Sequence, residues 1–349
     1  MVYFMNSFFF KFLVKHGGIP FFFIDSLYAI IIIINRKGIF VMKNIFIVNK
    51  AARTGKAAET WDELERYLNA NNIDYQVRFT SGAGDATEFA KEATSTGELV
   101  GLFVMGGDGT LNEAINGIVD FENTLYTPLP SGSANDFVAG IGLTGSALDI
   151  LKRALNTESY RVLDIGKVIY EGGERLFGVS SGIGVDAYVC LQALNSRLKK
   201  FLNHFGLGSA TYGLLTIGDI FTMPFADARI TAWFKGERIS MDVKRIIFAA
   251  AMNCRAEGGG VPMVPDAKPD SGFLSAFYAH DISRLKCFLR LPSLVAGKHK
   301  GKRGFDFLNF DKIHIKMNSP MCVHADGEHV GFFEEICFEC LPQTLKVRG

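Results

Sequence analysis

The sequence predicts two domains: an α/β domain built on a parallel sheet, followed by a mainly antiparallel β-sandwich domain. Three observations predict this order. The chain has 349 residues, more than one hydrophobic core usually organises. Between residues 43 and 137, short apolar segments alternate with amphipathic ones, which is typical of a parallel sheet covered on both faces. Beyond residue 160, strand-like segments instead come in pairs joined by glycine-containing turns.

The first half repeats a pattern of strand, loop and helix. We expect its strands at residues 43–49, 75–80, 99–105 and 124–129, with helices between them. The third of these strands is apolar throughout and ends in GGDGT, and the fourth is followed by PSGSANDF. Two loops of small residues therefore follow neighbouring strands, and each opens a helix.

The second half contains two strand pairs, one on each side of EGGE and one on each side of KGE. We expect strands at 161–170 and 175–182, and again at 228–234 and 238–253. Helical patterns interrupt them at 186–201, 212–221 and 282–296. Each of these is interpreted as an ordinary packing helix, although its apolar content would also suit a cover over a hydrophobic ligand.

Residues 1–41 are unusually rich in phenylalanine and isoleucine. Three interpretations compete: a membrane anchor, a secretory signal, or sequence upstream of the functional start. The longest apolar run is interrupted by Asp25 and Ser26 and is short for a spanning helix, and no small-residue cleavage site follows it. Since MKNIFIVNK already provides a first strand, we favour Met42 as the functional start and place a membrane anchor second.

The composition excludes some classes of protein. With 48% hydrophobic residues, 21% charged residues and a net charge of +1, the chain is typical of a globular protein, and we expect no nucleic-acid partner. The six cysteines are scattered, which favours a reducing compartment and hence a cytoplasmic protein.

The GGDGT loop at residues 106–110 has the features of a phosphate site. A helix that begins after a strand offers unpaired N–H groups and the positive end of its dipole, and glycines let a phosphate approach the backbone. Asp108 would repel that phosphate unless a divalent metal compensates, so the loop predicts a nucleotide with Mg²⁺. The alternative is a tight turn in which Asp108 caps the helix. PSGSANDF would face the same crevice from the next strand, although alone it would also suit an N-cap.

A second acidic motif, VHADGEHV, lies near the C-terminus. A hydroxyl group that attacks phosphorus needs a base, and Asp326 and Glu328 on either side of Gly327 can supply a base and an orienting partner. Alternate residues of an extended strand share a face, so we expect both acids to reach one site. The alternative is a hairpin turn with exposed acids.

Several motifs together resemble the catalytic domain of the diacylglycerol kinase family. They occur in the family's order: GGDGTLNEAINGI, PSGSANDF, SGIGVDA, EGGGVPMVPDAKPDSGFL and HADGE. The resemblance runs from Met42 to the C-terminus. It implies a nucleotide-binding domain at 42–163 whose fold is like those of NAD kinase and phosphofructokinase, a β-sandwich lipid-substrate domain at 164–330, and a final segment at 331–349 that returns to the first domain.

The resemblance also implies site residues and cofactors. ATP and Mg²⁺ are the implied cofactors, and the carboxylates of Glu328, Asp326 and Asp108 are the implied catalytic groups, with Asp136 and Asp164 in the same network. The implied nucleotide contacts are Asn49, Thr80, Gly106, Gly107, Asp108, Gly109, Thr110, Leu111, Asn112, Glu113 and Ser133.

Two positions depart from the family pattern. Its usual Asn-Pro in the first loop is Asn49-Lys50 here, and its Asp-Gly after PDA is Ser271-Gly272. Part of the family holds a structural Mg²⁺ near the second position, which leaves Asp270 as the candidate metal ligand.

The expected function is transfer of the γ-phosphate of ATP to a lipid hydroxyl, of diacylglycerol or a related lipid. We expect the lipid at a membrane surface, a cytoplasmic protein that associates peripherally with that surface, and a chain able to form a homodimer. The alternatives are a small-molecule kinase of the NAD kinase type and a catalytically silent lipid- or nucleotide-binding module. Gly182, Gly184 and Ala187 also fit GxGxxA, a weak signal for a dinucleotide fold.

Overall fold

The computed structural model describes residues 42–195 and 218–349, and of residues 53, 54 and 193–195 it describes only the backbone. The leader at 1–41 lies outside the described residues. So do the end of the helix expected at 186–201 and most of the one expected at 212–221.

The N-terminal domain has the predicted parallel sheet. Its strands are β1 (Lys43–Val48), β2 (Gln76–Phe79), β3 (Val100–Gly106) and β4 (Thr124–Pro130), in the order β2-β1-β3-β4. All three strand pairs are parallel. Every residue of β3 is buried, because helices cover both faces of the sheet.

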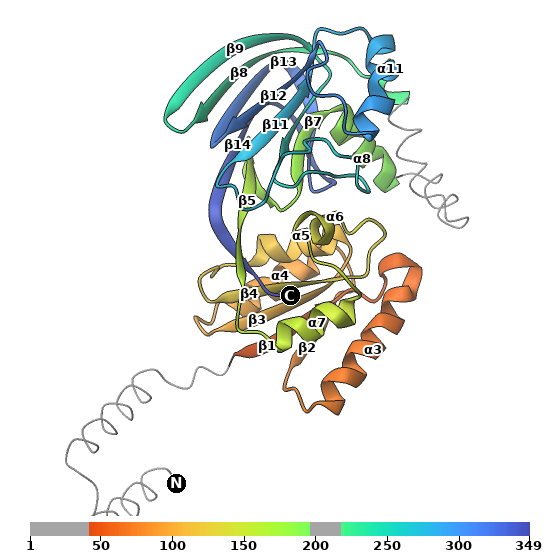
Figure 1. The fold of residues 1–349 in the computed structure, drawn as a ribbon, viewed down its shortest axis with the longest axis vertical. Coiled ribbons are helices and arrows are strands. Elements are labelled where there is room, and N and C mark those ends of the chain that lie inside the picture. Colours follow the sequence, from red (N-terminus) through yellow and green to blue (C-terminus); the bar gives the residue numbers. More distant parts are fainter. Residues whose placement is uncertain (1–41, 196–217) are drawn as a thin grey trace, which may run out of the picture. The chain divides into compact units, whose positions relative to one another are not determined.

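The helices of this domain pack as two pairs. They are α3 (Lys56–Ala70), α4 (Asp85–Thr94), α5 (Asp108–Gly117) and α7 (Ala147–Leu155), with a short η1 (Ala52–Gly55) and α6 (Asp136–Gly140). Helix α3 contacts α7, and α4 contacts α5. The chain steps from β1 to β2 and then back to β3, so right-handed crossovers place α3 and α4 on opposite faces of the sheet (Figure 1). The reversal between β1 and β3 is where ligands bind in such sheets.

The C-terminal domain is antiparallel, as predicted. Its elements are β5 (Arg161–Tyr170), β6 (Gly173–Phe177), β7 (Ser180–Gly184), α8 (Val185–Asn195), β8 (Ala226–Phe234), β9 (Glu237–Ile246), β10 (Phe248–Met252), β11 (Leu274–Ala279), α11 (Arg284–Val295), β12 (Phe305–Phe310), β13 (Lys312–Ala325) and β14 (Glu328–Val347). The predicted pairs about EGGE and KGE are β5–β6 and β8–β9. Strand β7 pairs antiparallel with β10 and β13, which excludes the dinucleotide-fold interpretation of GxGxxA.

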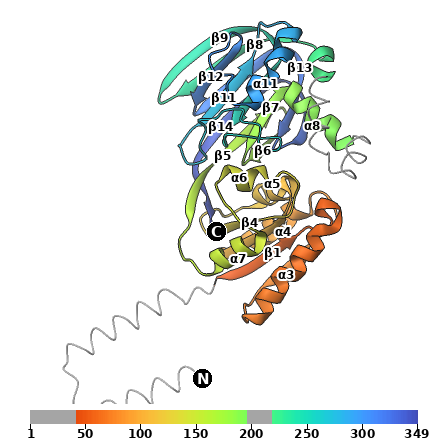
Figure 2. The ribbon, with the colours of Figure 1, turned by 45° about the vertical axis from the view of Figure 1, so that its right-hand side comes forward.

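Strand β14 joins the two sheets into one. Its first part pairs antiparallel with β13 and then β5, and its end pairs in parallel with β4, where Val347 lies opposite Tyr126. Figures 1 and 2 show β14 running from the antiparallel sheet into the parallel one. The start of β14 is therefore held in the C-terminal domain while its end is anchored in the N-terminal one.

Within the described ranges, none of the helices combines the length and the apolar character needed to cross a bilayer.

Candidate active site

Two glycine loops of the N-terminal domain touch through their backbones. The amide of Ser131 donates to the carbonyl of Gly106 at 3.0 Å. A Cβ added to Gly132 would lie 2.6 Å from the Cα of Gly107, so a side chain on Gly132 would push the loops apart. The predicted convergence of GGDGT and PSGSANDF on one place is therefore present, and it requires glycine.

The loop after β1 reaches the same place. The side-chain amide of Asn49 donates to Oγ1 of Thr110 at 3.0 Å, across the reversal between β1 and β3. Thr80, at the end of β2, donates its amide to Val48. The structure therefore places Asn49 beside the GGDGT loop and Thr80 at the same edge of the sheet.

Asp108 connects the two glycine loops. Its carboxylate accepts a hydrogen bond at 3.1 Å from the amide of Phe137, in the first turn of α6. Burial raises the pKa of Asp108 to about 6, and repulsion from Asp136 and Asp326 adds to the rise, while the Phe137 amide opposes it. The carboxylate of Asp108 thus caps helix α6. The charged groups that raise its pKa are other carboxylates.

Asp136 brings a second half-buried carboxylate to this place. It accepts a hydrogen bond at 2.9 Å from the amide of Gly259, in the EGGG loop of the C-terminal domain. Burial raises the pKa of Asp136, and the charge of Asp326 contributes. Asp108, Asp136 and Asp326 therefore repel one another, which a bound cation would relieve.

Asp326 does not lie on an extended strand, so the expectation that it shares a face with Glu328 is wrong. Asp326 and Gly327 form the turn between β13 and β14, both with positive φ (49° and 84°). The Asp326 carboxylate accepts from the amides of Gly178, Val179 and Ser180 and from Asn112, at 2.7 to 3.0 Å. These donors point Asp326 into the protein, where it anchors the turn.

Glu328 points to the glycine loop instead. Its Oε1 lies 2.7 Å from where a Cβ of Gly109 would be, so the carboxylate rests on the backbone of GGDGT. Gly109 is the second residue of α5, where phosphate-binding amides are expected. The structure thus places Glu328 of the C-terminal domain directly against the predicted phosphate loop.

The other implied nucleotide contacts differ in their surroundings. The Leu111 side chain is 1% exposed and belongs to the core, so it presents no side chain to a ligand. Asn112 is also buried; its amide donates to Asp326 and Leu176, and its oxygen accepts from Arg175. Asn112 therefore joins the two domains. Ser133 is exposed and Glu113 is half-buried, so both remain open to a ligand.

Asp270, the candidate metal ligand, pairs with an arginine side chain. It forms an ion pair with Arg161 at 3.6 Å, and both side chains are about half-exposed. Nearby Asp164 is buried, and its two oxygens accept from the amides of Gly272 and Gln343. Asp270 belongs to none of the groups of three metal-ligating side chains found among the described residues.

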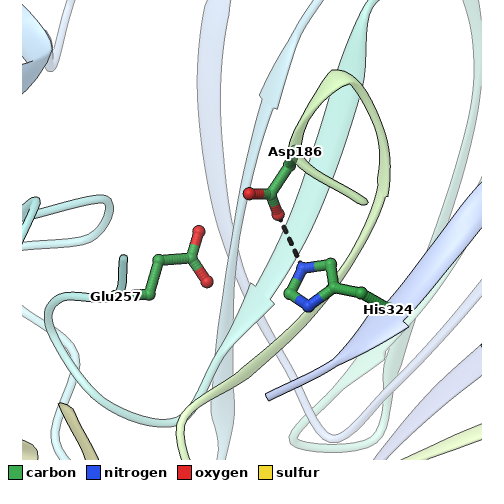
Figure 3. Close-up of side chains that lie close together, drawn as sticks. All are labelled: Asp186, Glu257 and His324. Carbon is green, nitrogen blue, oxygen red and sulfur yellow. Dashed lines mark hydrogen bonds and ion pairs between the residues drawn. The ribbon is translucent and has the colours of Figure 1, made fainter. Parts of the chain in front are cut away.

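Sequence reasoning missed a third group beside the turn, which consists of Asp186, Glu257 and His324 (Figure 3). Nε2 of His324 lies 2.7 Å from Asp186, and Glu257 hydrogen-bonds to Ser180. Burial raises the pKa of Glu257, and the charge of Asp186 adds to the rise. A Cβ on Gly182 would collide with Asp186 and His324, which explains the first glycine of GxGxxA.

The hydrogen bonds of His324 indicate whether Asp186, Glu257 and His324 can bind a metal ion. Burial disfavours the charged ring, whereas the carboxylate of Asp186 favours it and, on its own, raises the pKa of His324. The amide of Gly327 acts in the other direction, because it donates to Nδ1 at 3.1 Å and a second proton there would break this bond. The geometry thus places the ring proton on Nε2, toward Asp186. A metal at Nε2 would need the proton on Nδ1, so the group is a hydrogen-bonded network around the turn.

Comparisons with known proteins give a family match for each of the two domains. Residues 43–168 match the model of the diacylglycerol kinase catalytic domain, and residues 179–349 match the YegS C-terminal NAD kinase beta sandwich-like domain. A Bacillus subtilis protein named "Putative lipid kinase YtlR" is 26% identical over 82% of this chain and 93% of its own length.

Solved structures share the fold. A structure described as a putative diacylglycerol kinase from Bacillus anthracis covers 88% of this chain and 97% of its own, with a TM-score of 0.67 and 22% identity. An NAD kinase from Archaeoglobus fulgidus in complex with ATP covers 88% of this chain and 93% of its own, with a TM-score of 0.51 and 12% identity. The parallel and antiparallel parts therefore have the fold that these solved structures share. The chain belongs to the diacylglycerol kinase catalytic-domain family of lipid kinases.

Proposed function

We propose that this lipid kinase transfers the γ-phosphate of ATP, with Mg²⁺, to a lipid hydroxyl such as that of diacylglycerol. The observation that carries the proposal is the contact of Glu328 with Gly109, because it sets a carboxylate of the C-terminal domain against the predicted phosphate loop of the N-terminal one. A carboxylate base in contact with a phosphate-binding loop suits attack of an alcohol on phosphorus.

In the proposed reaction, the hydroxyl oxygen of the lipid forms a bond to the γ-phosphorus as the bond from phosphorus to the bridging oxygen breaks. ADP leaves, and the hydroxyl proton passes to Glu328. Asp326 is unsuited to this step because its carboxylate already accepts from three backbone amides and Asn112, so it positions the turn that carries Glu328.

The residues present fit Mg²⁺. Burial raises the pKa values of Asp108 and Asp136, and repulsion from neighbouring carboxylates adds to both shifts, so a cation would stabilise their ionised forms. Carboxylate oxygens, together with phosphate oxygens of a nucleotide, are the hard ligands that Mg²⁺ prefers. Asp108 is the residue we assign to the metal, and the ion would neutralise charge on the transferred phosphate.

The experiment is an acceptor panel with ATP labelled at the γ-phosphate. Diacylglycerol, ceramide, a sphingoid base, phosphatidylglycerol and NAD are offered separately, each with and without Mg²⁺. We expect label in a lipid only, and only with Mg²⁺. Label in NAD would establish the small-molecule kinase instead, and absence of label from every acceptor, with nucleotide still bound, would establish the silent binding module.

A further inference from the structure

Helix α11 is apolar on two sides. Cys287 faces inward and is buried in the core of the C-terminal domain, where Phe288 and Leu291 pack with it. On the outside, Leu285, Leu289 and Val295 are 59%, 65% and 64% exposed. Residues four apart share a helix face, so Leu285 and Leu289 form one exposed stripe. A helix of a globular protein normally places polar residues there.

The apolar area continues beyond the helix. Phe221 is 46% exposed, and its ring lies 5.9 Å from that of Phe288. We call the set Leu285, Leu289, Val295 and Phe221 the α11 surface. Nine large hydrophobic residues are exposed in the described part of the chain, and these four lie on or beside one helix.

Basic residues adjoin the α11 surface. Lys286 is exposed on the helix itself, and Lys298, Lys302 and Arg303 are exposed in the loop that follows. Arg290 of the helix donates to the carbonyl of Arg303, which keeps the loop beside α11. Lys300, in the same loop, is paired with Asp266 and is not counted.

We propose that the α11 surface enters the headgroup region of an anionic lipid bilayer. Exposed leucines with a phenylalanine beside lysines and arginines are the pattern of an interfacial helix, since the apolar side chains reach the acyl boundary while the cations meet lipid phosphates. A protein partner would need no such excess of positive charge. The inference rests on the proposed function, because a kinase whose acceptor resides in a bilayer must meet that bilayer.

The position of the helix is tested directly, in the full chain, with tryptophan as a depth probe. Leu289→Trp is compared with Ile239→Trp, a matched change at a residue of β9 that is 48% exposed. Emission is recorded, after subtraction of the unsubstituted protein, on vesicles that contain phosphatidylglycerol and lipids brominated in their acyl chains. We expect a blue shift and quenching for Leu289→Trp and neither for Ile239→Trp. Equal behaviour of the two, or a shift of Leu289→Trp without vesicles as protein concentration rises, would overturn the proposal.

A second pair of variants measures the contribution to binding. Leu285→Gln with Leu289→Gln should weaken binding to vesicles of phosphatidylcholine and phosphatidylglycerol by about tenfold or more, because two leucines no longer insert. Lys298→Gln with Lys302→Gln should weaken it several-fold, and only when phosphatidylglycerol is present. Ile239→Gln should change neither. Unchanged binding in both double variants would contradict the proposal.

Two different acceptors distinguish an effect on membrane binding from an effect on catalysis. The leucine variants should lose phosphorylation of long-chain diacylglycerol in vesicles and retain that of a water-soluble short-chain diacylglycerol. If no acceptor is phosphorylated by any form, the proposed function fails while the vesicle measurements still decide on the α11 surface. Equal loss on both acceptors, with normal vesicle binding, would remove the α11 surface from membrane recognition.

Discussion

The amide of Gly327 donates a hydrogen bond to Nδ1 of His324 at 3.1 Å, and the other nitrogen of that ring lies 2.7 Å from Asp186. One side of the β13–β14 turn is therefore tied to the first turn of α8. The other side is tied to residues 178–180 through the carboxylate of Asp326. Glu328 follows a turn that is held from both sides, so the backbone that directs it toward Gly109 is anchored.

His324 should thus act as a positioning residue. His324→Asn keeps an acceptor near Nδ1 for the Gly327 amide, whereas His324→Leu removes it. We expect the leucine variant to lower kcat by roughly 10- to 100-fold with little change in KM for ATP, and the asparagine variant to recover part of that loss, since small misplacements of a catalytic group are costly. Steady-state kinetics and melting temperatures check this. If both variants lose kcat equally, the bond to Gly327 is not what matters.

The sequence predicts the parallel sheet and the meeting of the two glycine loops because both depend on local pattern. Alternating apolar segments and their small-residue endings suffice to bring GGDGT and PSGSANDF together. It misplaced Asp326, because DG between two strands can be read as strand or turn. The sequence did not predict that Asn112 donates a hydrogen bond to Asp326, which lies 214 positions away. No local spacing encodes such a contact.

Asp108→Asn separates stability from activity. The pKa of Asp108 rises from 3.8 to about 6 on folding, so the native state favours the protonated form and ionisation costs stability. That cost is absent below the unfolded value and complete above the native one, so it grows as pH rises. Asparagine removes it, and should stabilise the protein by up to about 3 kcal/mol at neutral pH, an advantage that shrinks as pH falls.

The same variant should lose activity by on the order of 100-fold or more, because a charge that serves the metal is gone. Urea unfolding at several pH values and turnover at varied Mg²⁺ measure the two effects on one preparation. Unchanged turnover with unchanged dependence on Mg²⁺ would remove Asp108 from the reaction and leave it a helix cap.

Gly109→Ala tests the contact between the domains. The added methyl would fall 2.7 Å from Oε1 of Glu328, too close for both to stay in place. Since φ at Gly109 is not positive and alanine favours a helix, α5 should persist while Glu328 moves. We expect kcat to fall by roughly 100-fold with the melting temperature nearly unchanged. Gly82→Ala is the matched control, because a Cβ there meets nothing within 4 Å. Full activity of Gly109→Ala would show that Glu328 need not rest on the loop.

Glu328→Gln and Asp326→Asn should have different consequences, although one glycine separates them. Glu328 rests on the phosphate loop, and a positioned base contributes about 10²- to 10⁴-fold to the rate, so its amide variant should lose that much turnover and keep both ATP affinity and stability. Asp326 accepts from three backbone amides, and an amide group in its place would turn an N–H toward at least one of them. Asp326→Asn should therefore lower the free energy of unfolding by about 1 to 3 kcal/mol as well as the turnover. Turnover, ATP affinity and urea unfolding on the two purified variants make the comparison. Wild-type turnover in Glu328→Gln would remove the base assignment, lost ATP affinity would reassign Glu328 to the nucleotide or its metal, and an undiminished stability of Asp326→Asn would show that its amide contacts do not hold the turn.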